Sequence, residues 1–196
     1  MKITVYLGSN SGKDPIFEQT AAQLGDWIAQ EQHTLVYGGA RLGLMNIVAE
    51  HVLSHGGEVI GVMPTFMIDA ARQRNDLTEL IVTKDMSSRK KKMMDLADAY
   101  IALPGGPGTL EEISEVISSS RLGLLQKRPC MCLNLHGYYD VFAKMLEQMH
   151  ALGFVETAEL QYVFFPKSIE EVAQIMKQNH EGGNPYDRSQ YHCVGI

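Results

Sequence analysis

The sequence predicts an α/β fold built on a parallel β-sheet. Short, almost continuously apolar runs alternate along the chain with longer segments of helical periodicity. Strands that are apolar at nearly every position are typical of sheets covered on both faces. Regular alternation of strands and helices predicts right-handed crossovers between parallel strands. We therefore expect a Rossmann-like, doubly wound parallel sheet with helices on both faces.

The expected elements cover most of the chain. Strands are expected at residues 3–7, 34–37, 58–63, 80–83, 100–103, 130–135 and 162–165. Helices are expected at residues 15–31, 43–55, 88–97, 110–125, 138–151 and 168–179. The connection 65–78 is longer than an ordinary loop, and such loops are often functional lids. We find no repeat or linker, and we expect one domain over residues 1–180 and an irregular tail over 181–196.

Composition limits the classes of partner. The 196 residues are 45% hydrophobic and 20% charged, which is typical of a globular protein. The formal net charge of −6 argues against general binding to nucleic acid, which needs a basic surface. No apolar run approaches the roughly 20 residues of a membrane helix, and the chain starts without a signal peptide. Three cysteines without metal-like pairs fit a reducing compartment, so we expect a cytoplasmic protein with no nucleic-acid or membrane partner.

Three glycine-containing turns follow three of the expected strands. They span Gly8–Gly12, Gly38–Gly43 and Pro104–Thr109. Glycine lets the backbone approach a ligand, and the helix after each turn offers free N–H groups to an anion. One such turn is weak evidence, but three at one sheet edge favour an anionic ligand. The residues expected to bind it are Gly8, Ser9, Gly38, Gly39, Gly105, Gly106, Gly108 and Thr109.

The turns do not match the common nucleotide signatures. Gly8 and Gly12 are four positions apart, where a dinucleotide fingerprint needs G-x-G-x-x-G. A Walker loop needs Ser or Thr after its lysine, and Asp14 follows Lys13 here. NAD chemistry and ATP hydrolysis are therefore disfavoured, and we expect no cofactor.

Two basic residues, Arg89 and Lys90, precede the fifth expected strand. Ser87 or Ser88 is a candidate N-cap, which places Arg89 and Lys90 near the start of a helix. Cations there oppose the macrodipole by roughly 0.3–1 kcal/mol each, so stability alone would prefer acids. A guanidinium suits a phosphate or a pair of sugar hydroxyls. The alternative for this run is a solvated basic face.

Two carboxylates follow the third turn directly. Thr109 and Glu112 fit a capping box, in which Glu112 would serve only to cap the helix. Glu111 or Glu112 could instead reach a sugar held above the turn. A carboxylate there could stabilise positive charge on the sugar or position a water as a base. Both interpretations stay open at this point.

At these residues the sequence resembles the Lonely Guy (LOG) family of cytokinin-activating phosphoribohydrolases, once mislabelled as lysine decarboxylases. The signature P-G-G-x-G-T-x-x-E matches Pro104 to Glu112 in full, and the similarity extends from Gly8 to Tyr139. The resemblance implies a Rossmann-like fold, a homodimer or larger assembly, no metal, and release of a free base from a nucleoside 5′-monophosphate. It also implies that Arg89 and Glu112 are the catalytic pair. The further substrate-binding candidates are Met45, Lys90 and Glu111.

The sequence also departs from the family pattern. Ala71 stands where the family usually carries Glu, and Ser87-Ser88 replaces His-Glu. Because these changes border the expected base pocket, base specificity is less determined than phosphate and ribose binding. They leave a second reading, a non-catalytic carrier of a nucleotide or phosphorylated cofactor. The segment 110–125 is more apolar than one face can bury, which predicts a homodimer on this helix and the neighbouring helix 88–97.

Overall fold

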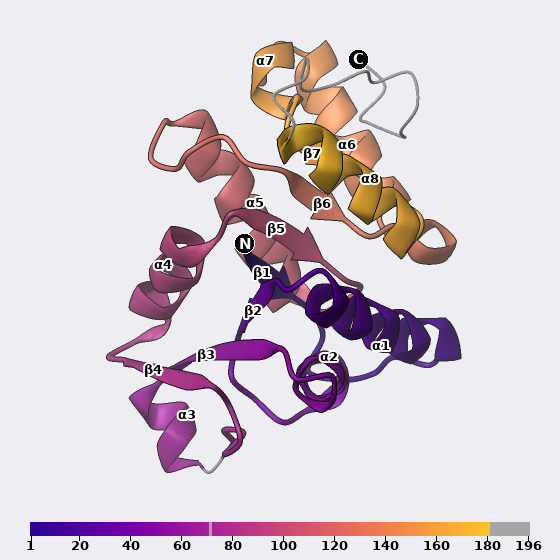
Figure 1. Cartoon of the computed structure of the whole chain (residues 1–196). Coiled ribbons are helices and arrows are strands. Elements are labelled where there is room, and N and C mark those ends of the chain that lie inside the picture. Colours follow the sequence, from indigo (N-terminus) through magenta and orange to yellow (C-terminus); the bar gives the residue numbers. More distant parts are fainter. Residues whose placement is uncertain (71, 181–196) are drawn as a thin grey trace.

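A seven-stranded parallel sheet forms the centre of the computed structural model, which describes residues 1–70 and 72–180 (Figure 1). Ala71 and the expected tail 181–196 lie outside the described residues. The strands are β1 (Lys2–Tyr6), β2 (Thr34–Tyr37), β3 (Glu58–Pro64), β4 (Glu79–Thr83), β5 (Ala99–Ala102), β6 (Cys130–Cys132) and β7 (Val163–Phe164). The helices are α1 (Pro15–Gln30), α2 (Gly43–Ser54), α3 (Thr65–Asp69), α4 (Met86–Leu96), α5 (Pro107–Arg121), α6 (Asp140–Ala151), α7 (Thr157–Leu160) and α8 (Ile169–His180).

The strand order is β4-β3-β2-β1-β5-β6-β7, and each neighbouring pair is parallel. The chain starts in the middle of the sheet, winds outward through β2, β3 and β4, and then returns to place β5 beside β1. This confirms the doubly wound parallel fold. In such folds ligands bind where the winding direction switches, which here is the carboxyl end of β1 and β5.

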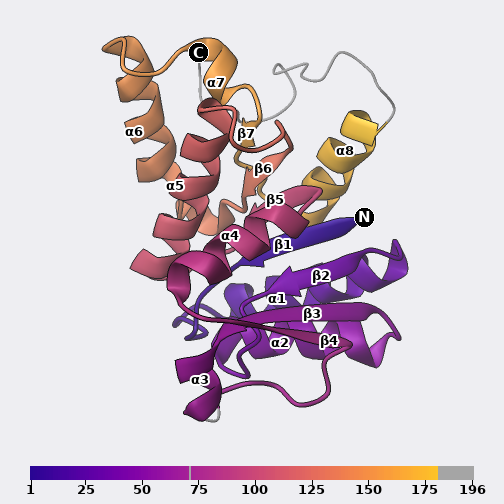
Figure 2. The same cartoon turned by 90° about the vertical axis from the view of Figure 1, so that its left-hand side faces the viewer.

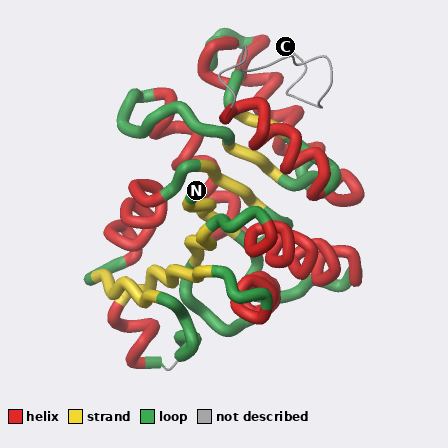
Figure 3. Tube along the Cα trace, in the orientation of Figure 1, coloured by secondary structure: helices red, strands yellow, loops and turns green. Residues whose placement is uncertain are grey.

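Helices cover both faces of the sheet, which lies in the interior (Figures 2 and 3). Side chains of α1, α2 and α8 share one hydrophobic core, and those of α4, α5 and α6 share the other. Strand β1 serves both cores, because Ile3 and Val5 face the first and Tyr6 faces the second. Burial on both faces explains the continuous apolar runs, and each large side chain buried this way contributes about 1.5–3 kcal/mol. None of the described helices is long and apolar enough to span a membrane.

Two helices begin earlier than the sequence predicts. The expected N-cap at Ser87 or Ser88 is wrong, because the Asp85 carboxylate caps α4 by accepting the Ser88 N–H at 2.7 Å. Of the two interpretations left open for Glu112, the capping box with Thr109 is not formed, because Gly106 is the N-cap of α5. Helix α5 starts at Pro107, whose fixed φ and missing N–H suit the first helical position. Its start places Glu112 in the second turn, where it no longer serves as a cap.

The long connection 65–78 contains α3 and is tied down by Arg74. The Arg74 N–H donates to the Gly39 carbonyl at 2.9 Å. Its guanidinium pairs with both oxygens of Asp76, at 2.6 and 3.0 Å, and donates to Asn46 Oδ1 at 2.9 Å. The connection is therefore fastened to the turn after β2 and to α2.

Candidate active site

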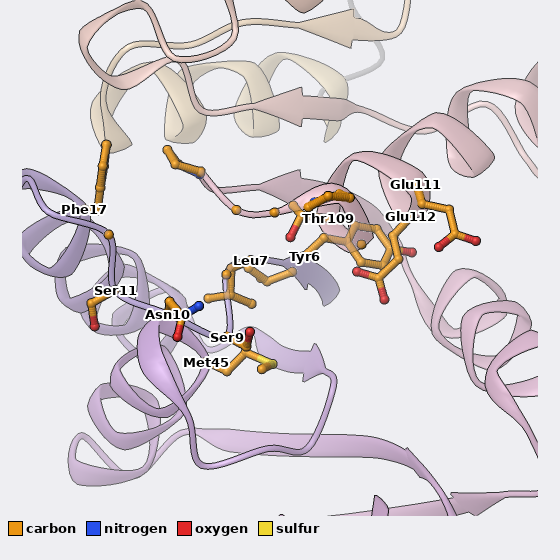
Figure 4. A pocket seen from close by; sticks show the side chains of 18 of the residues that line it. Tyr6, Leu7, Ser9, Asn10, Ser11, Phe17, Met45, Thr109, Glu111 and Glu112 are labelled. Atoms are coloured by element: carbon orange, nitrogen blue, oxygen red, sulfur yellow. The ribbon is translucent and has the colours of Figure 1, made fainter.

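A cavity of about 520 Å³ opens at the carboxyl ends of β1 and β5, where the winding switches (Figure 4). The turns after these two strands supply much of its wall. The rest comes from side chains near the start of several helices. Its lining includes Tyr6, Gly8, Ser9, Asn10, Ser11, Gly12, Phe17, Met45, Met67, Arg89, Met93, Pro104–Thr109, Glu111, Glu112 and Tyr138.

The glycine turns touch one another at this cavity. A Cβ added to Gly105 would lie 3.0 Å from Gly8 N and 2.2 Å from Thr109 Oγ1. A Cβ added to Gly43 would lie 2.5 Å from the Ser9 carbonyl carbon. Side chains at Gly105 or Gly43 would push the turns apart. The turns after β1 and β5 therefore converge on one cavity as predicted, but Gly38 and Gly39 of the turn after β2, which were expected there too, are not part of its lining.

Helix α5 aims its N-terminus at this space. Unpaired N–H groups and the macrodipole give a helix N-terminus about half a positive charge. The Cβ positions of Gly106 and Gly108 have no atom within 4 Å, so the backbone there is open to a ligand. Such a terminus is suited to bind a phosphate or another anion.

Arg89 and Glu112 form a buried ion pair in the cavity wall. Arg89 Nη1 lies 2.8 Å from Glu112 Oε1, and the two side chains are only 9% and 12% exposed. Arg89 Nε donates to the Val62 carbonyl of β3 at 3.0 Å. The pair therefore joins α4 to α5, and the hydrogen bond to β3 fixes the position of the Arg89 guanidinium.

Burial and charge act in opposite directions on Glu112. Loss of solvent raises the pKa of the Glu112 carboxyl above its ordinary value, and the adjacent Arg89 guanidinium lowers it in part. Burial first, and then the Glu112 charge, raise the pKa of the Tyr6 phenol well above its ordinary value. Tyr6 therefore stays neutral, and its ring lies beside Glu112 in Figure 4.

Three predicted site residues do not line the cavity. Gly38 lies under the guanidinium instead, since a Cβ there would stand 2.1 Å from Arg89 Nη2. Gly39 accepts a hydrogen bond from Arg74, and its Cβ position faces Met63. Lys90 Nζ pairs with Glu111 Oε1 at 2.6 Å and with Glu115 Oε2 at 2.9 Å. The other predicted residues, ten in number, are all part of the lining.

Sequence reasoning missed the aromatic residues of the site. The Tyr138 hydroxyl donates to the Gly105 carbonyl, which ties the segment before α6 to the turn after β5. The Tyr138 ring meets Phe17 of α1 edge to face, with centroids 6.2 Å apart. Phe17 follows the first glycine turn closely, and this spacing was the available signal. Nothing in the sequence order relates it to Tyr138.

The described residues offer no evident metal site. Within residues 1–70 and 72–180, no three His, Cys, Asp or Glu side chains are grouped as metal ligands would be. The charged side chains that line the cavity are thus one guanidinium and two carboxylates, and they lie beside the open N-terminus of α5. It suits an anionic ligand whose reaction develops positive charge near Glu112.

Comparison with known proteins identifies the family. Residues 45–176 match the family model described as "Possible lysine decarboxylase". A cytokinin riboside 5′-monophosphate phosphoribohydrolase of Rhodococcoides fascians is 43% identical over 169 residues, which are 86% of this chain and 85% of the relative. This chain belongs to the LOG family. Two further LOG-family relatives carry the same enzyme name: one from Arabidopsis thaliana is 34% identical over 90% of this chain and 81% of its own, and one from Oryza sativa subsp. japonica is 37% identical over 89% and 72%.

Solved structures share the fold of this LOG-family protein. The molybdenum cofactor binding protein of Rippkaea orientalis has a TM-score of 0.68 at 24% identity, over 90% of this chain and 94% of that chain. The molybdenum cofactor carrier protein of Chlamydomonas reinhardtii has a TM-score of 0.69 at 22% identity, over 92% and 98%. At these identities the likeness concerns the fold alone.

Proposed function

We propose that this LOG-family protein hydrolyses the N-glycosidic bond of a nucleoside 5′-monophosphate and releases a free base and ribose 5-phosphate. AMP and N6-substituted AMP, including cytokinin riboside 5′-monophosphates, are the candidate substrates. The observation that carries the proposal is the buried Arg89–Glu112 pair beside the open N-terminus of α5. The names of the relatives, at 34–43% identity, support the same reaction.

The phosphate is assigned to the start of α5. Backbone N–H groups of Gly106, Gly108 and Thr109, with help from Ser9, would hold its oxygens at the positive end of the helix. The ribose would then lie over the second turn of α5, where Glu112 faces the cavity. Arg89 would orient the ribose or the phosphate through its planar guanidinium.

The proposed reaction uses the Glu112 carboxylate. Breaking the bond between C1′ and the base nitrogen builds positive charge on the ribose, which a carboxylate stabilises. The C1′–N bond breaks with its electron pair on the base nitrogen, a water oxygen bonds to C1′ and gives a proton to Glu112, and Glu112 then releases that proton to solvent while the base nitrogen takes up one proton from solvent. Glu112 must be ionised at the start, and the Arg89 guanidinium favours that state. No lysine belongs to the cavity lining given above, so a pyridoxal-type decarboxylation has no anchor there.

A turnover assay tests this proposal. The purified protein is incubated with AMP, isopentenyl-AMP, GMP and CMP, and both ribose 5-phosphate and free base are measured. We expect equal amounts of both products from at least one purine nucleotide. Binding of a nucleotide without any product would instead favour the carrier alternative, for which the distant structural neighbours supply only a shared fold.

We also propose that the protein is a cytoplasmic homodimer. Ile113 and Val116 of α5 face the core, but Leu110 near its start is 43% exposed, and Leu122 and Leu124 just beyond its end are 67% and 73% exposed. Uncovered apolar side chains at and after this helix fit a second subunit. The buried free thiols of Cys130 and Cys132 fit a reducing compartment. Light scattering at micromolar concentration tests the assembly, and a monomer would contradict it.

A further inference from the structure

Lys90 follows the catalytic candidate Arg89 in α4, yet it points to a different set of partners. Its Nζ lies 2.6 Å from Glu111 Oε1 and 2.9 Å from Glu115 Oε2, both on α5. The Lys90 side chain is 16% exposed, whereas that of Glu111 is 65% exposed. Two successive residues of α4 are thus each paired with carboxylates of α5.

The cluster is not an ordinary surface ion pair. The Glu115 Oε2 atom is shielded from solvent and makes no hydrogen bond within residues 1–70 and 72–180, although the Glu115 side chain as a whole is 37% exposed. The Lys90 ammonium, 2.9 Å away, is the charge that offsets this oxygen, and removing the ammonium would leave it without a counter-charge, which is costly. The hydrogen bond that Lys90 donates to Glu111, and then its interaction with Glu115, raise the pKa of Lys90 above its ordinary value, so Lys90 is charged at neutral pH.

Helices α4 and α5 make few close backbone approaches to each other. They cross on the same face of the sheet (Figure 2), and charged side chains bridge them where they border the cavity. Three charged groups act on Glu112, namely Arg89 and Lys90 from α4 and Glu111 on its own helix, and the Tyr6 phenol of β1 interacts with it as well. Lys90 is paired in turn with Glu115.

We propose that Lys90, Glu111 and Glu115 form a positioning cluster that locks α4 to α5 and sets the charge balance around the Arg89–Glu112 pair. Lys90 adds a positive charge on the side of Arg89, and Glu111 adds a negative charge beside Glu112. The two neighbours therefore act on the Glu112 carboxylate with opposite signs. The catalytic role of the Glu112 carboxylate rests on the proposed function, whereas the ion pairs of the cluster are observed independently of it.

Because the two charges shift the pKa of Glu112 in opposite directions, their effect can be distinguished from an effect of packing alone. Lys90→Met keeps a long unbranched side chain and removes the charge, so the pKa of Glu112 should rise. Glu111→Gln is an exposed, near-isosteric change that leaves the Lys90–Glu115 pair intact, so the pKa of Glu112 should fall. Each shift should be about half a unit or more, the scale of one charge–charge interaction at a partly buried site.

The measurement is a ¹³C NMR titration of the Glu112 carboxyl carbon in the full-length protein labelled at glutamate, assigned by its loss in Glu112→Gln. Lys90→Arg, which keeps the charge, should titrate close to the wild type. If Lys90→Met fails to fold, Lys90→Met/Glu115→Gln removes the orphaned carboxylate and should still raise the Glu112 pKa.

Shifts in the same direction, or none, in folded Lys90→Met and Glu111→Gln proteins would overturn the proposal. If the wild type turns over a nucleotide, the acidic limb of its kcat profile should move with the NMR value. Because the titration needs no turnover, an inactive wild type would count against the proposed function alone.

Discussion

Gly38→Ala is the substitution whose effect follows most directly from the site geometry. The added Cβ would stand 2.1 Å from Arg89 Nη2, whereas ordinary contact begins near 3.4 Å. The guanidinium must therefore retreat by more than about 1 Å, since the glycine has an ordinary φ and the alanine backbone fits. A displacement of about 1 Å at a reacting centre can reduce turnover by roughly a hundredfold. Overpacking should cost about 1–3 kcal/mol of unfolding free energy.

The assay measures kcat/KM for the preferred nucleotide together with the free energy of urea unfolding. A double-mutant cycle with Arg89→Ala supplies the control, because residues in contact are not additive. If Gly38→Ala acts by moving Arg89, it should cost little further activity in the Arg89→Ala background. Full, independent losses in both backgrounds would refute the reasoning.

Three more predictions concern the same cavity. Glu112→Gln should lower kcat about a hundredfold or more, because the amide oxygen still accepts from Arg89 but carries no charge. The free energy of unfolding should also fall, because the buried Arg89 guanidinium loses its counter-charge. Normal turnover with nucleotide would contradict the carboxylate mechanism. The activity of the wild type should fall as the pH drops through the raised pKa of Glu112, because protonated Glu112 cannot stabilise the ribose cation. In a profile of kcat against pH, this acidic limb should lie above the ordinary glutamate range. An acidic limb within or below that range would argue against Glu112 as the titrating group. Tyr138→Phe should cost about 0.5–1.5 kcal/mol in urea unfolding, because it removes the hydroxyl that donates to Gly105 and keeps the ring against Phe17; an unchanged stability would show that this hydrogen bond contributes nothing.

The fold could be predicted because runs of apolar residues mark the strands that are buried on both faces. β5 is apolar at every position, and β1 departs from this only at Lys2 and Thr4; such runs have few arrangements other than a covered parallel sheet. Their carboxyl ends then had to meet at one edge, which located the glycine turns. The ends of helices were harder to predict. Helix α5 begins at Pro107 and not at Thr109, although both residues suit the start of a helix.

Side-chain partners across the sheet could not be predicted from local patterns. Gly38 carries the signature of a ligand loop, but its missing side chain makes room for Arg89, which is 51 positions away along the sequence. Lys90 is a substrate-binding candidate in the sequence, and the register of α4 against α5 turns it toward Glu111 instead. These relations depend on how two helices pack, which neither composition nor periodicity specifies.

The winding of the sheet also affects how the protein is made. β1 pairs with β5 through partners as distant as Ile3 and Ala99, so a ribosome must synthesise half the chain before the central pairing can close. Until then β1, β2, β3 and β4 present an unpaired apolar edge, of the kind that recruits strands from other chains. Long-range parallel pairing is also slow. Truncated products that end before β5 should therefore aggregate, and nascent chains of this protein should be clients for chaperones that cover exposed strand edges.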